Sequence, residues 1–188
     1  MKMKLFLLGC GLSIGVASPG FAATTTGTIA AKLVLTAGCL VNGLPATTGA
    51  AFGDLDFGSS AATFTTIDTT LVGTQGNGIY VRCSTGSTYT IQLVSSSAKP
   101  ATVYGTETAQ PRYLINSTTA TIGVAYTLYT SNAYTTPIAN NTNLVPVGTA
   151  DPVKGDNYPI FGRIAGGGNN AAIPAGTYQD SISVAVNY

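Results

Sequence analysis

The feature that most constrains the fold of this chain is a two-residue alternation of apolar side chains, which is clearest near its two ends. Within the stretch from Thr24 to Cys39, the apolar residues in phase are Ile29, Ala31, Leu33 and Leu35. The stretch from Tyr178 to Tyr188 has the same rhythm, with Ile182, Val184, Val186 and Tyr188 in phase. Successive side chains of a strand point to opposite faces, so both stretches predict β-strands.

Short alternating runs of the same kind recur along the chain, and glycine, proline and asparagine separate them. The clearest lie at 79–83, 88–94, 121–129 and 158–164. No segment of useful length has the 3.6-residue period of an amphipathic helix. About seven short strands between turn residues predict an all-β sandwich.

Three local features carry more specific expectations. Asn42-Gly43 is typical of a tight turn that reverses the chain. Gly86 separates two alternating runs by a few residues, which predicts that 75–84 and 88–94 form a hairpin. We also expect residues 178–188 to form one final strand.

The start of the chain has the pattern of a secretory signal peptide. Lys2 and Lys4 precede an apolar run over 5–16, and the small residues Gly20 and Ala22 follow it. We expect cleavage after residue 22, because the run is too short and too rich in glycine for a membrane anchor. A lipoprotein cleavage before Cys10 would leave an apolar core of only about five residues, below the usual range.

The charge of the chain is low and nearly balanced. Charged residues make up 8% of the sequence, against about a quarter in an average domain. Without Lys2 and Lys4 of the leader, 6 basic residues (8 minus 2) remain against 7 acidic ones, so nothing favours binding to nucleic acid or to an acidic membrane surface. Threonine, serine and asparagine provide the polarity instead, and a weakly charged chain of this kind favours association between strands.

The cysteines predict one disulfide and no metal site. Cys10 leaves with the signal peptide, so Cys39 and Cys83 remain in an exported chain and are expected to pair. The chain contains no histidine, so these two thiols lack the further ligands of a zinc site, and no serine has an imidazole to activate it. We therefore expect no catalytic residue, no metal and no cofactor.

A few acidic and aromatic residues invite a functional interpretation, and a structural one is simpler for each. Asp54 and Asp56 lie two residues apart, but catalytic carboxylate pairs normally come from separate segments around a cleft, so we expect a solvent-facing edge. Asp180 is expected to cap a turn. Tyr178 resembles the tyrosine corner of β-sandwiches, which is a structural device.

Taken in order, the motifs of the chain resemble those of the spore coat U domain family, which includes the major subunits of archaic, Csu-type chaperone–usher pili. The resemblance covers the chain after the leader, and residues 95–150 match only in general character. The motifs that carry it are the alternating strand 29–35 with Thr36-Ala37-Gly38-Cys39, Phe52-Gly53 with Phe57-Gly58, Ile79–Cys83, Ile160–Ile164, and Pro174–Asp180 leading into the last strand.

The resemblance implies an immunoglobulin-like β-sandwich that lacks one strand. It further implies that a periplasmic chaperone lends a strand until an outer-membrane usher replaces it with the N-terminal strand of the next copy. In that scheme residues 1–22 are the leader, 23–38 the donor segment with Ile29, Ala31, Leu33 and Leu35 facing inward, and 39–188 the pilin domain. Residues Ile182, Val184, Val186 and Tyr188 then border the acceptor cleft. The expected location is a pilus on the cell surface, reached through the periplasm, where it supports adhesion and biofilm formation.

Two other interpretations remain open on the sequence. The first is a stand-alone secreted coat or matrix protein, in which the strand over 29–35 packs inside its own domain. The second is a carbohydrate-binding adhesin, for which the ten tyrosines would supply stacking surfaces. Most of these tyrosines are in phase with predicted strands, so we expect them in the core or on a sheet. The sequence does not distinguish a shaft subunit from a minor adaptor.

Overall fold

The computed structural model describes residues 26–28, 30–36, 38–45, 49–167 and 169–188. The predicted leader and Ile29 lie outside the described residues. The chain divides into two units, Met1–Leu35 and Thr36–Tyr188. Within the described ranges, no helix is long and apolar enough to cross a membrane.

The second unit consists of strands in four sheets, and its described part contains a single turn of 3-10 helix, η1 (Asn170–Ala172). The largest sheet has the order β13 (Tyr178–Gln179), β9 (Arg112–Asn116), β10 (Ile122–Tyr129), β12 (Phe161–Ala165), β3 (Thr66–Thr70), with β8 (Thr102–Tyr104) parallel to β10. A second sheet has the order β11 (Asp156–Tyr158), β6 (Ile79–Cys83), β1 (Cys39–Val41), β2 (Leu44–Pro45). The remaining pairs are β14 (Ser183–Asn187) with β7 (Thr90–Ser95), and β4 (Val72–Gly73) with β5 (Gly76–Asn77).

The core forms where the inward faces of these sheets meet. The alternation in β6 buries Ile79 and Val81 completely, and the alternation in β10 buries Tyr126 and Leu128. Side chains from β1, β7, β11 and β12 join the cluster, among them Cys39, Val41, Ile91, Leu93, Tyr158 and Ile164. The sequence prediction of an all-β, immunoglobulin-like sandwich is confirmed.

The predicted turn at Asn42-Gly43 is confirmed, and the predicted hairpin at Gly86 is wrong. Asn42 and Gly43 both have positive φ angles, 49° and 81°, and they join β1 to β2. Strand β6 pairs with β1 on one edge and with β11 on the other, so neither edge pairs with β7. Strand β7 pairs instead with β14, and residues 141–144 hydrogen-bond to its other edge.

The final stretch of the chain divides into two strands that belong to different sheets. Strand β13 pairs with β9, and β14 pairs with β7. The turn before β13 is held by the Tyr178 hydroxyl, which donates to the Pro174 carbonyl oxygen at 2.8 Å. A tyrosine that bonds to backbone a few residues upstream is the tyrosine corner that the sequence suggested.

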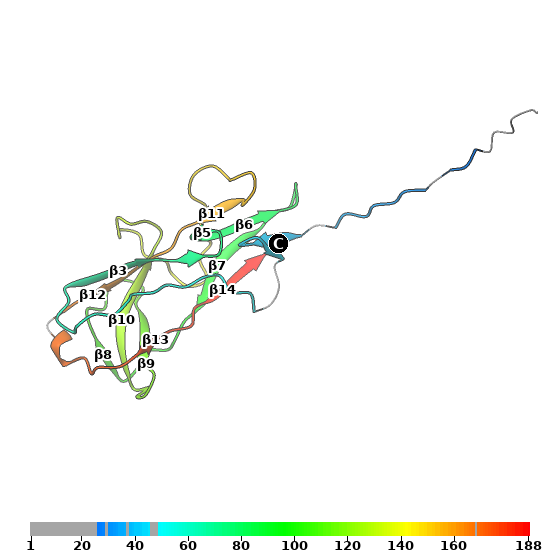
Figure 1. Ribbon diagram of the computed structural model, residues 1–188. Coiled ribbons are helices and arrows are strands. Elements are labelled where there is room, and N and C mark those ends of the chain that lie inside the picture. The colour runs from blue at the N-terminus through cyan, green and yellow to red at the C-terminus, as the bar shows by residue number, and fades with distance from the viewer. Residues whose placement is uncertain (1–25, 29, 37, 46–48, 168) are drawn as a thin grey trace, which may run out of the picture. The chain divides into compact units, whose positions relative to one another are not determined.

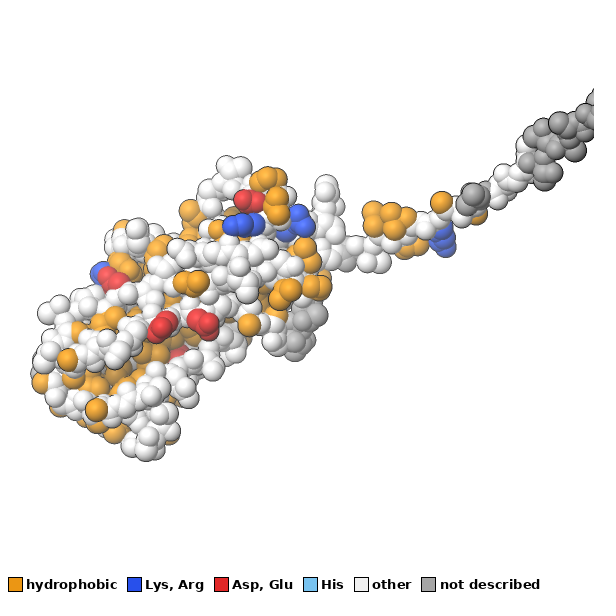
Figure 2. Space-filling view, in the orientation of Figure 1, with side chains coloured by type: hydrophobic (Ala, Val, Ile, Leu, Met, Phe, Trp, Pro, Cys, Tyr) orange, Lys and Arg blue, Asp and Glu red, His pale blue; other side chains and the backbone are white. Residues whose placement is uncertain are grey.

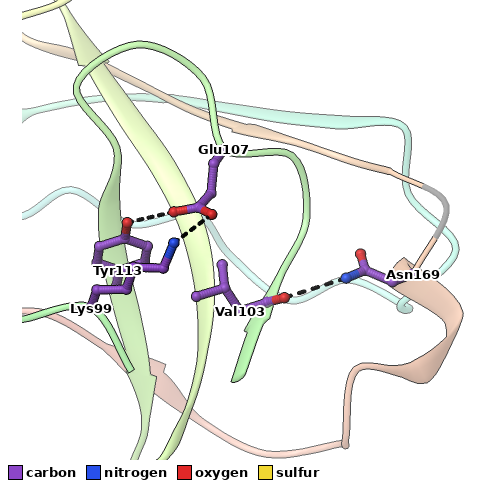
Figure 3. A network of polar contacts seen from close by, with 5 residues as sticks. All are labelled: Lys99, Val103, Glu107, Tyr113 and Asn169. Carbon is purple, nitrogen blue, oxygen red and sulfur yellow. Dashed lines mark hydrogen bonds and ion pairs between the residues drawn. The ribbon is translucent and has the colours of Figure 1, made fainter. Parts of the chain in front are cut away.

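The long connection between β7 and β9 carries a small polar network (Figure 3). Glu107 accepts hydrogen bonds from Lys99 Nζ at 2.8 Å and from the Tyr113 hydroxyl at 2.5 Å. The bond from Lys99 and then that from Tyr113 lower the pKa of Glu107. The Asn169 side chain reaches the carbonyl oxygen of Val103 at 3.3 Å, which ties the loop before η1 to β8.

Five tyrosines of this fold, Tyr89, Tyr113, Tyr126, Tyr134 and Tyr158, have raised pKa values and should titrate late, which destabilises the protein in alkali. Burial, followed by the bond to Glu107, raises the pKa of Tyr113 to about 12. Burial also raises the pKa of Tyr89 and of Tyr126, each of which donates to a carboxylate. Since the unfolded chain loses its phenolic protons near pH ~10, stability is full below that pH and is lost as the pH rises toward about 12. Tyrosinate absorbance should therefore rise in two stages, the second together with the loss of circular dichroism. A single stage near pH ~10 with the fold intact would contradict this.

The disulfide expected between Cys39 and Cys83 is present, and it links residues that lie directly opposite each other in β1 and β6. It closes a loop with a sequence separation of 44. Replacing both cysteines by serine should lower the free energy of unfolding by about 4 kcal/mol in the chain-entropy model, measured by urea unfolding of the oxidised chain. A reducing agent should have the same effect on the unsubstituted chain and none on the double variant. An unchanged urea midpoint in the double variant would show that the bridge adds no stability.

Candidate functional site: an apolar cleft beside the last two strands

A cleft of about 700 Å³ opens in the Thr36–Tyr188 unit. Residues 50–58 form one wall, and residues 178–182 with Val184 form the other. In Figure 1 these walls are the cyan trace and the red trace that run across the same face, with β10 behind them. In Figure 2 hydrophobic side chains gather in the hollow of this face. The floor consists of Leu71, Ile79, Leu93, Leu114, Tyr126, Leu128 and Ile160.

The cleft combines apolar side chains with polar groups at its walls, and it does not open the deepest part of the core. Ile79 and Leu128 on the floor are 0% exposed, because the walls and neighbouring strands shield them. Several apolar side chains from both walls and the floor remain half-buried: Phe52, Leu55, Phe57, Leu114, Ile182 and Val184. An occupant of the cleft would therefore complete the burial of side chains that the domain leaves partly covered.

The wall over 50–58 is held from its outer side by a few backbone contacts. Asp54 exchanges two backbone hydrogen bonds of 2.9 Å with Val72, and the Asn42 side chain donates to the Phe52 carbonyl oxygen. Gly53 has a φ of +127°, and a Cβ atom there would lie 2.5 Å from the Val72 carbonyl oxygen. Only glycine fits this approach, so the Phe-Gly pair is a packing requirement of the wall.

The acidic residues of this wall lie at its exposed rim. Asp54 and Asp56 are exposed, as the sequence predicted for a solvent-facing edge. The Asp56 carboxylate accepts a hydrogen bond from the Gly58 N–H at 2.7 Å. This bond gives Asp56 a local structural role at the end of the wall.

The opposite wall presents an unpaired strand edge. Strand β13 pairs with β9 and β14 pairs with β7, and in the described part of the chain no other strand pairs with either. Extended backbone in this position carries a row of N–H and C=O groups that a further strand could pair with. The edge at Ser183–Asn187 has no charged side chain.

Asp180 has a different role from the predicted turn cap. Its carboxylate accepts hydrogen bonds from the Tyr126 hydroxyl at 2.6 Å and from the Ser97 N–H at 2.7 Å. These partners lie 54 and 83 residues away in the sequence, so the contact is tertiary. It fixes the point at which the chain leaves β13 for β14.

The alternating segment before Cys39 forms no strand in its described residues, 26–28 and 30–36. Its large aliphatic side chains are exposed, with Leu33 at 79%, Val34 at 68% and Leu35 at 83%. A run of consecutive exposed aliphatic residues is unfavourable in water and marks a segment that binds another surface. A segment with this two-residue period forms a ladder of backbone hydrogen bonds only when a neighbouring strand pairs with it.

The structure brings together part of the predicted site. Ile182 and Val184 line the cleft, whereas Val186 of β14 and Tyr188, which follows β14, lie outside the lining. Sequence reasoning did not identify the wall over 50–58 or Tyr126 on the floor. The spacing of Phe52, Leu55 and Phe57 is not periodic, and only the adjacent glycines marked this stretch.

The start of β1 is firmly anchored next to the exposed segment in the sequence. Beyond the disulfide at Cys39, the Gly38 carbonyl oxygen accepts bonds from the Ser84 N–H at 2.9 Å and the Ser84 hydroxyl at 3.1 Å. The Ser84 hydroxyl oxygen also accepts from the Gly38 N–H at 3.1 Å. The chain is therefore fixed within a few residues of Leu35.

Comparison with known proteins agrees with this arrangement. No curated protein sequence matches the chain. The sequence model of the Spore Coat Protein U domain matches residues 25–185, which include the exposed segment, both cysteines and both walls of the cleft. The chain therefore belongs to the Spore Coat Protein U domain family, whose members are structural subunits of pili or coats of the chaperone–usher class.

Proposed function

We propose that this protein is a structural subunit of a surface pilus that is assembled by donor-strand complementation. The N-terminal segment of one copy would fill the cleft of the next. The observation that carries the proposal is the apolar cleft beside the unpaired edges of β13 and β14. A strand placed there would pair with the open edge and cover the half-buried side chains of both walls.

The length of the segment fits the cleft. The wall over 50–58 contains nine residues, which span at most about 30 Å when extended. The in-phase set from Ile29 to Leu35 extends over six residue steps, or about 20 Å. Residues of the opposite phase, Lys32 and Val34, would face outward from the cleft.

The energetics favour a slowly dissociating junction. Burial of Ile29, Leu33 and Leu35 would contribute about 1.5–3 kcal/mol each before the cost of ordering the segment. Backbone hydrogen bonds along the strand add to this and must break together. Each copy offers one segment and one cleft, so the contact is heterologous and extends into a filament.

The proposal also implies the partners. A subunit with an open apolar cleft needs a temporary strand until the next copy arrives, and a periplasmic chaperone supplies one in the chaperone–usher pathway. An outer-membrane usher then exchanges the strands and exports the filament, which supports adhesion and biofilm formation at the surface. Four of the ten tyrosines, Tyr113, Tyr126, Tyr129 and Tyr158, are at most 7% exposed, so these four offer no aromatic face to a sugar.

A matched pair of substitutions in the exposed segment tests the phase of the strand. Leu33→Asn should weaken each junction by roughly ten- to a hundredfold, because a leucine side chain would no longer be buried. Val34→Asn should leave assembly unchanged, because its side chain faces outward. Denaturing gels without heating, together with size exclusion of the full-length chain, measure the polymer ladder. Equal effects of the two substitutions would contradict a strand that is bound by one face.

Deletion and transplantation of the segment test the cleft. Removing residues 24–35, with the leader kept, should abolish polymers and leave an incomplete domain. Attaching residues 26–36 after Tyr188 through a flexible linker should restore a stable monomer, because the tethered strand reaches a high effective concentration at the cleft. Thermal melting followed by circular dichroism compares the two chains.

The stand-alone coat protein predicts a different result. In that case the intact chain is a monomer that folds without a chaperone, and the deletion variant fails to fold even with the segment attached at its C-terminus. A deletion variant as stable as the self-complemented chain would also contradict the proposal, because the cleft would then need no occupant.

A further inference from the structure

One floor residue contacts both walls of the cleft. Tyr126, on β10, is 2% exposed and its ring lies on the cleft floor. Its ring meets Phe57 of the 50–58 wall edge-to-face, with the ring centroids 5.6 Å apart. Its hydroxyl donates to Asp180 of the opposite wall at 2.6 Å. A single side chain therefore fixes the position of each wall relative to the floor.

We propose that Tyr126 is a spacer that holds the cleft open at the width of one strand before the donor arrives. This inference rests on the proposed function and adds to it a positioning residue. Without a spacer, two apolar walls beside an open edge would close on each other, because closure removes apolar surface from water. A cleft that is already formed requires less reorganisation when it binds a strand.

The hydrogen bonds on the Asp180 side hold the Tyr126 spacer in a fixed position. A buried phenol needs a hydrogen-bond partner, and a carboxylate is a strong acceptor. The second carboxylate oxygen of Asp180 is bound to the Ser97 N–H, so Asp180 cannot turn away without breaking both bonds. Arg112, opposite Tyr126 in β9 and 3% exposed, adds a positive charge that attracts the Asp180 carboxylate.

The packing of the wall over 50–58 fixes the contact that the Tyr126 ring makes with Phe57. Phe57 sits over Gly162 of β12, where a Cβ atom would lie 2.8 Å from the Phe57 ring. Because Gly162 has no Cβ atom, Phe57 has room to reach Tyr126. The spacer and its two contacts come from three separate segments, which contain Phe57, Tyr126 and Asp180. No local sequence pattern therefore reveals the spacer.

Tyr126→Phe tests the spacer, and Tyr113→Phe is its matched control. Both substitutions remove one phenolic hydroxyl that donates to a carboxylate, and Tyr113 lies outside the cleft lining. In the full-length chain, Tyr126→Phe should slow polymer formation by about ten- to a hundredfold, the factor expected when a hydrogen bond to a charged group no longer holds the open state. Tyr113→Phe should assemble at the unsubstituted rate.

A second readout separates positioning from stability. In the self-complemented chain the attached strand keeps the walls apart, so both phenylalanine variants should show similar, small decreases in melting temperature.

Phe57→Leu, which removes the ring contact from the other wall, should slow assembly in the same way as Tyr126→Phe. Assembly of Tyr126→Phe at the unsubstituted rate, or equal slowing by Tyr113→Phe, would overturn the spacer and leave donor-strand assembly intact. An unsubstituted full-length chain that forms no polymer would overturn both.

Discussion

The pairing of strand edges is the constraint on which the rest of this structure depends. Backbone N–H and C=O groups at an open edge can pair with any available strand, and two edge strands of the domain carry features that oppose this. Strand β2 ends at Pro45, which cannot donate, and β3 carries Asp68 in a bidentate ion pair with Arg163 at 2.7 Å. The β14 edge has neither a proline nor a charge, and it adjoins the apolar cleft. This edge is therefore better suited to receive a strand than those of β2 and β3.

The sequence predicted those elements that a pattern among neighbouring residues marks. Period-two alternation located β6 and β10, Asn42-Gly43 located the first turn, and the count of cysteines located the bridge. Which strands pair is not a local property in a sandwich, and the Gly86 hairpin failed for that reason. The break between β13 and β14 was also missed, because the bonds that Asp180 makes there reach distant parts of the chain.

The candidate site was predicted only in part, for related reasons. The alternation that includes Leu33 and Leu35 marks a strand, but it has no partner among the described residues and so forms no ladder. The wall over 50–58 lacks periodicity, since glycine-dependent close packing positions it rather than a regular ladder. Tyr126 was predicted as a strand residue, but its contacts with both walls arise only from the tertiary fold.

The anchoring of Gly38 and Cys39 has a mechanical consequence for a filament. Tension would pass from the inserted segment through residues 36–38 into β1, where the disulfide and the Ser84 bonds transfer it to β6. The short connection leaves little slack, so a pull loads the inserted strand along its length. Hydrogen bonds loaded in shear share the force, whereas bonds that are peeled break one after another. In the proposed filament, stretching would thus load the domain in its strongest direction.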